Sequence, residues 1–300
     1  MDHRHFLSSL TADERLHLTR QTNTPGLLRI ALNAIVIGLL IVGIVNRVPG
    51  WPLLCLLLGI LLVFLFTLMH ETTHDTVFTS KFANQLVAAF CGLVLILPPV
   101  WFRHFHLAHH RYTQDPERDP ELASPKPDSL ISYLIYLSGL PVWSSNFKAL
   151  LRNASGRGDD WFIPSSLQPL VRREAVAMCL LYGGIITWSL ISGTLLLLWV
   201  WVVPLILGQP FLRLFLLAEH GLCPVASDAN LRNMFAATRT TLTNSAVRLL
   251  SWNMSYHTEH HVYPTVPFHR LPELHQRLAR FLCNTSDGYA RFHQEYRTGF

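Results

Sequence analysis

Residues 48–74 read VPGWPLLCLLLGILLVFLFTLMHETTH, and this stretch decides the fold. Its first 22 residues, Val48 to Met69, carry no charge and are rich in leucine, isoleucine, valine and phenylalanine. About 20 apolar residues are enough to cross the hydrocarbon core of a bilayer as a helix. The stretch therefore predicts a membrane-spanning helix. Its last five residues, His70-Glu71-Thr72-Thr73-His74, place two histidines four positions apart where that helix leaves the membrane.

The composition of the whole chain excludes an ordinary soluble globule. Half of the 300 residues are apolar, 14% are charged and the mean hydropathy is positive, whereas about a quarter of a typical soluble domain is charged. Sixteen histidines are a second anomaly, because ionisable side chains are costly in lipid and mark function there. The five cysteines are scattered singly. We therefore predict no disulfide framework and no cysteine-rich zinc site, and a reducing, cytosol-facing active region.

Two further apolar stretches complete the predicted spans. Ile30 to Val45 is apolar apart from Asn33, and a turn at Arg47-Val48-Pro49-Gly50 joins it to the span above as a hairpin. Ala175 to Leu212 is uncharged for 38 positions, the length of two spans, with a turn expected at Ser192-Gly193. We therefore expect four transmembrane helices in two hairpins, at about residues 30–46, 50–70, 174–192 and 194–217.

Two weaker apolar segments lie between the hairpins. Phe82 to Phe102 is uncharged but is interrupted by polar residues, glycine and Pro98-Pro99, and Ser129 to Phe147 is similar. Such segments are typical of half-buried or interfacial helices. We expect one such helix in each.

The distribution of lysine and arginine predicts the orientation, because cytoplasmic loops retain these residues. Of the 24, nine lie between Arg103 and Arg173 and eight from Arg232 onward, while Arg47 alone falls in a predicted outer loop. We expect a multi-pass integral membrane protein with both termini and the active site in the cytoplasm, in the inner (plasma) membrane if the source is bacterial. The net charge of +5 then follows from topology, and no motif suggests a nucleic-acid partner.

The histidines gather in three boxes on the predicted cytoplasmic side. After His70-x-x-x-His74 come His106-Leu107-Ala108-His109-His110 and His257-Thr258-Glu259-His260-His261. Helix positions four apart share one face, so the first pair can address a single point, and positions i, i+3 and i+4 lie on one stripe. Two copies of His-x-x-His-His plus this pair are an improbable accident. We interpret the isolated histidines as hydrogen-bonded structural residues: His3, His5, His17, His269, His275 and His293.

Eight box histidines exceed what one metal ion can use, since zinc takes about four ligands and octahedral iron about six. Two ions are therefore predicted. Imidazole suits iron, copper, nickel and zinc alike, but removing hydrogen from an unactivated C–H bond requires a redox metal with oxygen, which zinc cannot supply. We therefore expect two iron ions, molecular oxygen as co-substrate, and no catalytic side chain beyond the metal centre.

With these three boxes in this order, the sequence resembles the membrane fatty acid desaturase and hydroxylase superfamily over about residues 50–275. The resemblance implies an all-α integral membrane protein of four helices with a cytosolic helical cap that carries a histidine-bound di-iron centre. It also implies electrons from a ferredoxin or a b-type cytochrome, which we expect to be a separate partner with its reductase. Family members usually have a histidine near the inner end of the fourth span, and His220 occupies that place. The resemblance makes it a ninth ligand, although a helix end would also suit an uncoordinated histidine.

The expected organisation is a cytosolic N-terminal segment, residues 1–29, followed by a membrane desaturase domain, residues 30–300, with its cap at 70–173 and 218–300. The expected metal ligands are His70, His74, His106, His109, His110, His220, His257, His260 and His261. Metal-binding histidines usually donate their other ring N–H to a neighbouring acceptor. The carboxylates near the boxes are candidates for this role: Glu71, Asp75, Asp115, Asp119 and Glu259.

We predict an oxidoreductase, namely an oxygen-dependent di-iron desaturase that introduces a double bond into a fatty acyl chain of a membrane lipid or thioester. A hydroxylase or ketolase of a lipid or carotenoid from the same superfamily is the alternative, because desaturation and hydroxylation both begin with hydrogen abstraction. His70-Glu71-x-x-His74 also matches the zinc metalloprotease motif, but a membrane protease would leave six box histidines unexplained. A metal transporter should hold its sites at mid-membrane, not beyond the span ends.

Overall fold

The computed structural model describes residues 2–225 and 233–300. Within this part, four helical segments are long and apolar enough to cross a membrane: Ala12–Val45, Trp51–Thr73, Ser165–Ile191 and Leu198–His220. They correspond to the four predicted spans, which are confirmed at the level of length and composition. Their arrangement as two membrane hairpins with a cytosolic cap stays a prediction.

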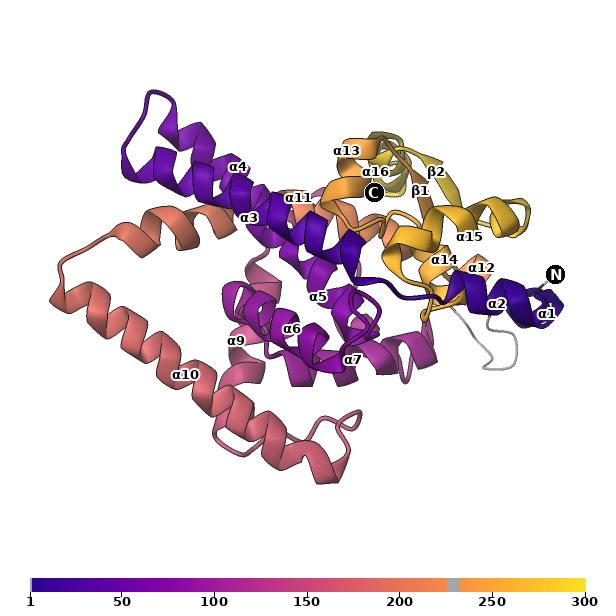
Figure 1. Cartoon of the computed structure of the whole chain (residues 1–300), viewed down its shortest axis with the longest axis horizontal. Coiled ribbons are helices and arrows are strands. Elements are labelled where there is room, and N and C mark those ends of the chain that lie inside the picture. The colour runs from indigo at the N-terminus through magenta and orange to yellow at the C-terminus, as the bar shows by residue number, and fades with distance from the viewer. Residues whose placement is uncertain (1, 226–232) are drawn as a thin grey trace.

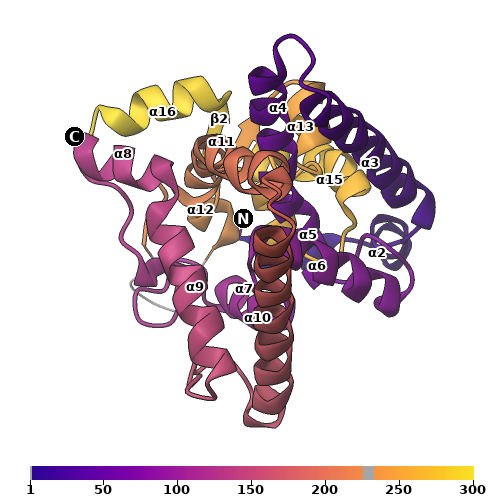
Figure 2. The ribbon, with the colours of Figure 1, turned by 90° about the vertical axis from the view of Figure 1, so that its left-hand side faces the viewer.

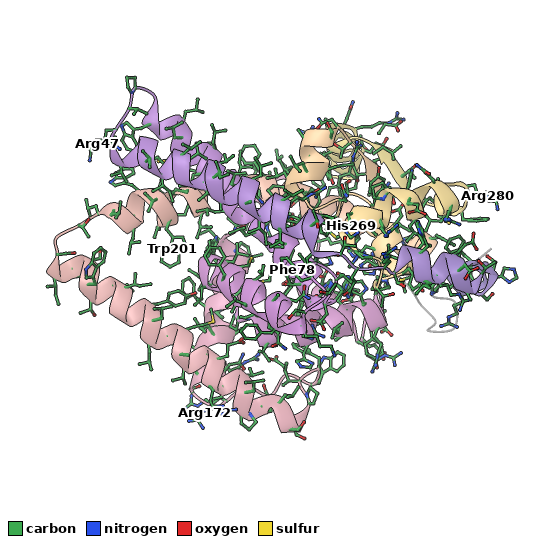
Figure 3. All side chains as sticks on the ribbon, viewed as in Figure 1. Arg47, Phe78, Arg172, Trp201, His269 and Arg280 are labelled. Carbon is green, nitrogen blue, oxygen red and sulfur yellow. The ribbon has the colours of Figure 1, made fainter. Side chains whose placement is uncertain are left out.

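The first two long helices are antiparallel neighbours. Helix α3 (Asn23–Val45) ends at a short turn, and α4 (Trp51–Val63) begins after it. Gly50 has a φ of +83°, a left-handed conformation that glycine adopts without strain. Pro52 lies in the first turn of α4, where a helix tolerates the missing backbone N–H. This turn and Arg47 lie at the end of the molecule remote from the C-terminal helices (Figures 1 and 3).

The second and fourth long helices pack backbone against backbone. A methyl group at Gly59 of α4 would overlap the Pro204 carbonyl of α11 (Val203–His220), and one at Gly208 would overlap the Gly59 carbonyl. Small residues allow this approach, which is how helices gain contact in lipid. Helix α4 runs on into α5 (Leu65–Thr73) after a break at Phe64. From their contact, α4 and α5 lead to His70 of the first box, and α11 leads to His220.

The segment predicted as one interfacial helix at 82–102 is instead two helices. Helix α6 (Lys81–Leu95) and α7 (Pro99–Tyr112) are bent by 100° at the break. Ile96 has a φ of +55°, and Pro98-Pro99 supply no backbone N–H to continue α6. The bend lets α7 carry the second box into the interior. The other weak segment is also two helices, α8 (Leu130–Ser138) and α9 (Leu140–Ala154), which divide at Gly139.

The C-terminal strands and helices gather near the C-terminal end of α11 (Figures 1 and 2). Strands β1 (Thr240–Leu242) and β2 (Thr285–Asp287) pair in parallel, with Thr240 opposite Thr285. Helix α14 (His257–Val262) carries the third box. The other helices are α1 (His3–Ser9), α2 (Ala12–Leu18), α10 (Gln168–Ile191), α12 (Met234–Ala237), α13 (Ser245–Leu250), α15 (Leu271–Leu278) and α16 (Tyr289–Arg297).

Candidate metal centre

All nine predicted ligands come together, although they are carried by four elements that are far apart in sequence. Their ring nitrogens form two groups, and within each group the nitrogens lie within 4.8 Å of one another. The first histidine group is His70, His74, His106, His110 and His260. The second histidine group is His109, His220, His257 and His261.

The first histidine group joins α5, α7 and α14. The Nε2 atoms of His70 and His260 are 2.8 Å apart, and those of His74 and His106 are 2.9 Å apart. His110 completes the group, and neither of its ring nitrogens has a hydrogen-bond partner among the described residues. Five Nε2 and Nδ1 donors thus converge on one point without any carboxylate ligand in the group.

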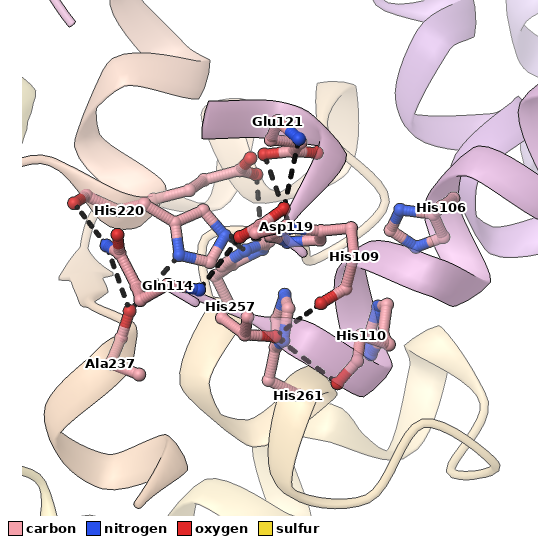
Figure 4. Close-up of polar contacts among 12 residues, drawn as sticks. His106, His109, His110, Gln114, Asp119, Glu121, His220, Ala237, His257 and His261 are labelled. Carbon is pink, nitrogen blue, oxygen red and sulfur yellow. Dashed lines mark hydrogen bonds and ion pairs between the residues drawn. The ribbon is translucent and has the colours of Figure 1, made fainter. Parts of the chain in front are cut away.

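The second histidine group joins α7, α11 and α14 (Figure 4). His220 lies at its middle, with its Nε2 3.1 Å from Nε2 of His109 and 2.8 Å from Nε2 of His257. The His261 ring stacks on His110 of the first group, with centroids 4.0 Å apart and planes 7° apart. The two groups are therefore adjacent, as a pair of neighbouring metal ions requires.

The second and third boxes do not each address one point. In α7, His106 and His110 face the first histidine group, whereas His109 faces the second. In α14, His260 faces the first group, whereas His257 faces the second. Positions i and i+3 differ by about 60° around a helix, which is enough to direct neighbours on one stripe to either side of it. Each of these two helices thus lies between the groups.

Each histidine of the second group has an oxygen atom near its Nδ1; three of these contacts are hydrogen bonds, and the fourth, between Glu219 and His257, is a close contact only. Asp119 Oδ1 is 2.9 Å from Nδ1 of His109, and Glu219 Oε1 is 3.3 Å from Nδ1 of His257. The Ala237 carbonyl is 3.2 Å from Nδ1 of His220. His261 Nδ1 is 3.3 Å from the Thr113 hydroxyl. Such contacts fix the tautomer of a metal-binding histidine and leave its other nitrogen free to coordinate.

Burial and charge make this donor set suit metal ions. Desolvation lowers the pKa of His257, His260 and His261 well below the ordinary histidine value, so these imidazoles are neutral at pH 7 and can coordinate. Buried polar atoms are normally hydrogen-bonded, yet His261 Nε2 and both nitrogens of His110 have no partner in the described chain. Ions bound by the two groups would satisfy the converging nitrogens.

The other carboxylates named from sequence hold the structure together around the site. Glu71 Oε1 accepts hydrogen bonds from the Thr76 hydroxyl at 2.6 Å and the Phe268 N–H at 2.8 Å. Glu259 accepts one from the Thr240 hydroxyl at 2.6 Å. Neither carboxylate belongs to a histidine group. They tie α5 and α14 to neighbouring segments.

Two further carboxylates from the predicted set stabilise local structure. Asp75 pairs with Arg103, at 2.9 Å, and Asp115 pairs with Arg118, also at 2.9 Å. Asp119 is thus the one member of the set that contacts a grouped histidine in the described structure. Reasoning from sequence missed Glu219, although its position beside His220 was an available signal. It also missed Ala237, which no sequence pattern marks because the contact is made by a backbone carbonyl.

Comparison with known proteins agrees with this arrangement. Residues 49–293 match the family model described as fatty acid desaturase. A sphingolipid delta(4)-desaturase of Komagataella phaffii is 24% identical over 70% of this chain and 56% of its own length. A second, from Drosophila melanogaster, is 26% identical over 76% of this chain and 65% of its own length. A delta(12)-oleate desaturase of Trichosanthes kirilowii is 24% identical over 75% of this chain and 67% of its own length.

The match covers most of this chain but only part of the length of its relatives. The chain spans about three fifths of the length of the first two sphingolipid desaturases it matches, at 56% and 59%. The family model, in contrast, covers residues 49–293 of the 300, which include all nine grouped histidines. The chain therefore belongs to the fatty acid desaturase family.

Proposed function

We propose that this protein is an oxygen-dependent, di-iron lipid desaturase. The observation that carries the proposal is the convergence of nine histidines into two adjacent nitrogen-only groups at the ends of apolar helices. The chain belongs to the fatty acid desaturase family, and the oxidation of an unactivated hydrocarbon requires a redox metal. One ion would be held by the first histidine group and the second by the second group. Two bound irons would supply the oxidising chemistry that removes two hydrogens from adjacent carbons.

The chain's own residues hold and shield this chemistry. Asp119 and Glu219 orient His109 and His257 from behind. Glu71 and Glu259 fasten the helices that carry the first and third boxes, which limits movement of the ligands. The described histidines of both groups are buried or half-buried, so the site excludes bulk water. No protein side chain is needed as a nucleophile.

We propose a long fatty acyl chain of a membrane lipid as the substrate. The relatives named above act, by their names, on sphingolipid and on oleate, and both contain such chains. Two helices that are long and apolar enough to cross a membrane end at histidines of the two groups, which supports a site beside the bilayer. A thioester is the alternative carrier of the same acyl chain. Electrons would come from a separate ferredoxin or b-type cytochrome with its reductase.

We propose the same orientation that the charge distribution predicts. Both termini and the cap, residues 70–173 and 218–300, would lie in the cytoplasm, with residues 1–29 as a cytosolic segment before the membrane domain at 30–300. The electron donor would then reach the histidine groups from the cytoplasmic side. This proposal is supported by Arg47, which lies at the opposite end of the molecule from the cap (Figure 3).

The deciding experiment is lipid mass spectrometry after expression in a host that lacks desaturase activity. We expect lipids that have lost two hydrogens, together with close to two irons per purified chain, because two nitrogen groups are present. A gain of one oxygen instead would assign the protein to hydroxylation. Stoichiometric zinc with peptidase activity would contradict the proposal.

Matched histidine variants make the test specific to the site. His109→Ala and His260→Ala remove one ligand from each histidine group and should abolish lipid oxidation, while membrane insertion, which depends on the spans, is unchanged. His104→Ala is the control, because His104 lies in α7 but in neither group. Full activity in either ligand variant would reject the assignment of that histidine.

A further inference from the structure

A second candidate site lies far from the histidine groups, where α9 ends and α10 begins. A pocket of about 820 Å³ opens between Asn153 of α9, the loop at Gly156, and the first turns of α10. None of the nine grouped histidines lines it. We propose that this pocket binds an anionic phospholipid, with the phosphate at its cationic rim and an acyl chain along α10.

Two cations of the pocket have free guanidinium groups in the described part of the chain. Arg172 and Arg173 line the pocket, and among the described residues neither side chain has an ion-pair or hydrogen-bond partner. The neighbouring cation Arg152 is different, because its guanidinium is held by Asp160, which also accepts a hydrogen bond from the Trp101 indole at 2.7 Å. The two pocket arginines therefore keep their full capacity to bind an anion.

The pocket lining also includes a buried polar side chain. Asn153 is 3% exposed and lines the pocket. Its Nδ2 has no hydrogen-bond partner among the described residues. A buried amide N–H without a partner costs free energy, and an acceptor oxygen in the pocket would remove that cost. A phosphate bound in the pocket would offer acceptor oxygens to this amide and to the arginines.

The loop backbone at Gly156 lies close to the guanidinium of Arg172. Gly156 has a φ of +76°, and a β-carbon there would lie 3.2 Å from Cζ of Arg172. Glycine adopts this conformation without strain and leaves space for the guanidinium beside the loop.

The character of the pocket changes along α10 from cationic to apolar. Arg173, Val176 and Leu180 all line the pocket and lie on one stripe of the helix. Leu180 is 72% exposed, within a helix that qualifies as a membrane span. The order of cations and then apolar side chains along α10 matches a lipid, in which a charged headgroup is joined to a hydrocarbon chain. Basic pockets beside membrane spans bind anionic lipid headgroups. A free phosphate ion would leave the apolar stripe uncovered.

Native mass spectrometry of the purified protein with phosphatidylglycerol or phosphatidylcholine tests the proposal. We expect tighter binding of phosphatidylglycerol and a loss of about tenfold or more in its affinity for the Arg172→Gln/Arg173→Gln double variant. The Arg4→Gln/Lys81→Gln variant removes the same charge at exposed positions outside the pocket and should bind as the unmodified protein does. Equal losses in both double variants, or none in the pocket variant, would overturn the proposal.

Two further measurements separate the sources of an effect. Asn153→Leu removes the unpartnered amide without changing the net charge and should weaken the binding of phosphatidylglycerol. Its iron content should stay unchanged, and this unchanged iron content would show that the variant is folded. Millimolar inorganic phosphate should not displace the lipid. Displacement by inorganic phosphate would identify a simple anion site and contradict a lipid site.

Discussion

Gly59 and Gly208 bring the backbones of α4 and α11 into direct contact, and each glycine leaves no space for a side chain. His70 lies 11 residues after Gly59, in α5 beyond the break at Phe64, and His220 lies 12 residues after Gly208, at the end of α11. Gly208 and His220 are therefore about 18 Å apart along α11 by the rise of an α-helix. The contact of α4 with α11 thus precedes a ligand of the first histidine group along one segment and a ligand of the second along the other.

Valine at Gly59 or Gly208 should destabilise the protein severely. The added side chain would overlap a backbone carbonyl of the other helix, which neither helix can avoid without moving, so we expect a loss of about 3 kcal/mol or more. The measurement is thermal unfolding in detergent followed by size-exclusion chromatography. Iron content should fall together with the melting temperature.

Gly38→Val is the matched control for these variants, because a β-carbon at Gly38 of α3 would meet nothing within 4 Å. We expect it to keep its melting temperature and iron content. If it lost stability as strongly as Gly59→Val, the cause would be the loss of a glycine in an apolar helix rather than the contact between α4 and α11.

Asp119→Asn should weaken metal binding by the second histidine group selectively. Asp119 Oδ1 contacts Nδ1 of His109, and its Oδ2 accepts the Gln114 N–H at 2.8 Å. Outer carboxylates of this kind contribute about 10–100-fold to metal affinity. We expect about one iron per chain after a chelator challenge that leaves two in the unmodified protein, measured by mass spectrometry of the metal.

Asp287→Asn is the control for this loss, since Asp287 lies in β2, carries an exposed carboxylate and contacts Arg291 rather than a histidine. Retention of both irons by Asp119→Asn under the same challenge would show that the carboxylate does not support the site.

Acid should destabilise the metal-free protein below about pH 6.5. Burial lowers the pKa of His257, His260 and His261 in the folded chain, whereas the same residues titrate near pH 6.5 when unfolded. Below that pH the unfolded chain binds more protons than the folded one, so the free energy of unfolding decreases as the pH falls. Melting temperatures measured between pH 5 and 8 should decrease only on the acid side. A midpoint independent of pH would contradict the neutral, buried state of these imidazoles.

Cysteine labelling should report the orientation in the membrane. Cys283 is exposed and lies in the segment after the third box, whereas Cys223 is buried and its pKa is raised to about 11 by desolvation. A membrane-impermeant maleimide should therefore label Cys283 in inside-out vesicles and leave right-side-out vesicles unlabelled. Cys283→Ser should remove this labelling. Equal labelling from the outer side would reverse the proposed topology.

Much of the architecture could be predicted from local sequence, because its signals are local. The apolar run from Val48 to Met69 is long enough for a span whatever it packs against. The same reasoning failed at 82–102, where composition alone suggested one helix. The 100° bend between α6 and α7 depends on Pro98-Pro99, whose lost backbone donors interrupt the helix.

By itself, the sequence determined that the chain is apolar enough for a membrane, that histidines recur in three boxes and that eight imidazoles are too many for one ion. Only the tertiary structure decided which imidazole faces which neighbour. It separated His109 from His106 and His110, and it placed Glu219 and the Ala237 carbonyl behind the second histidine group. Helix periodicity defines which residues share one face of a helix. The residues that this face contacts depend on how helices distant in sequence pack together. In this protein, α4 and α11 pack through a backbone contact at Gly59 and Gly208.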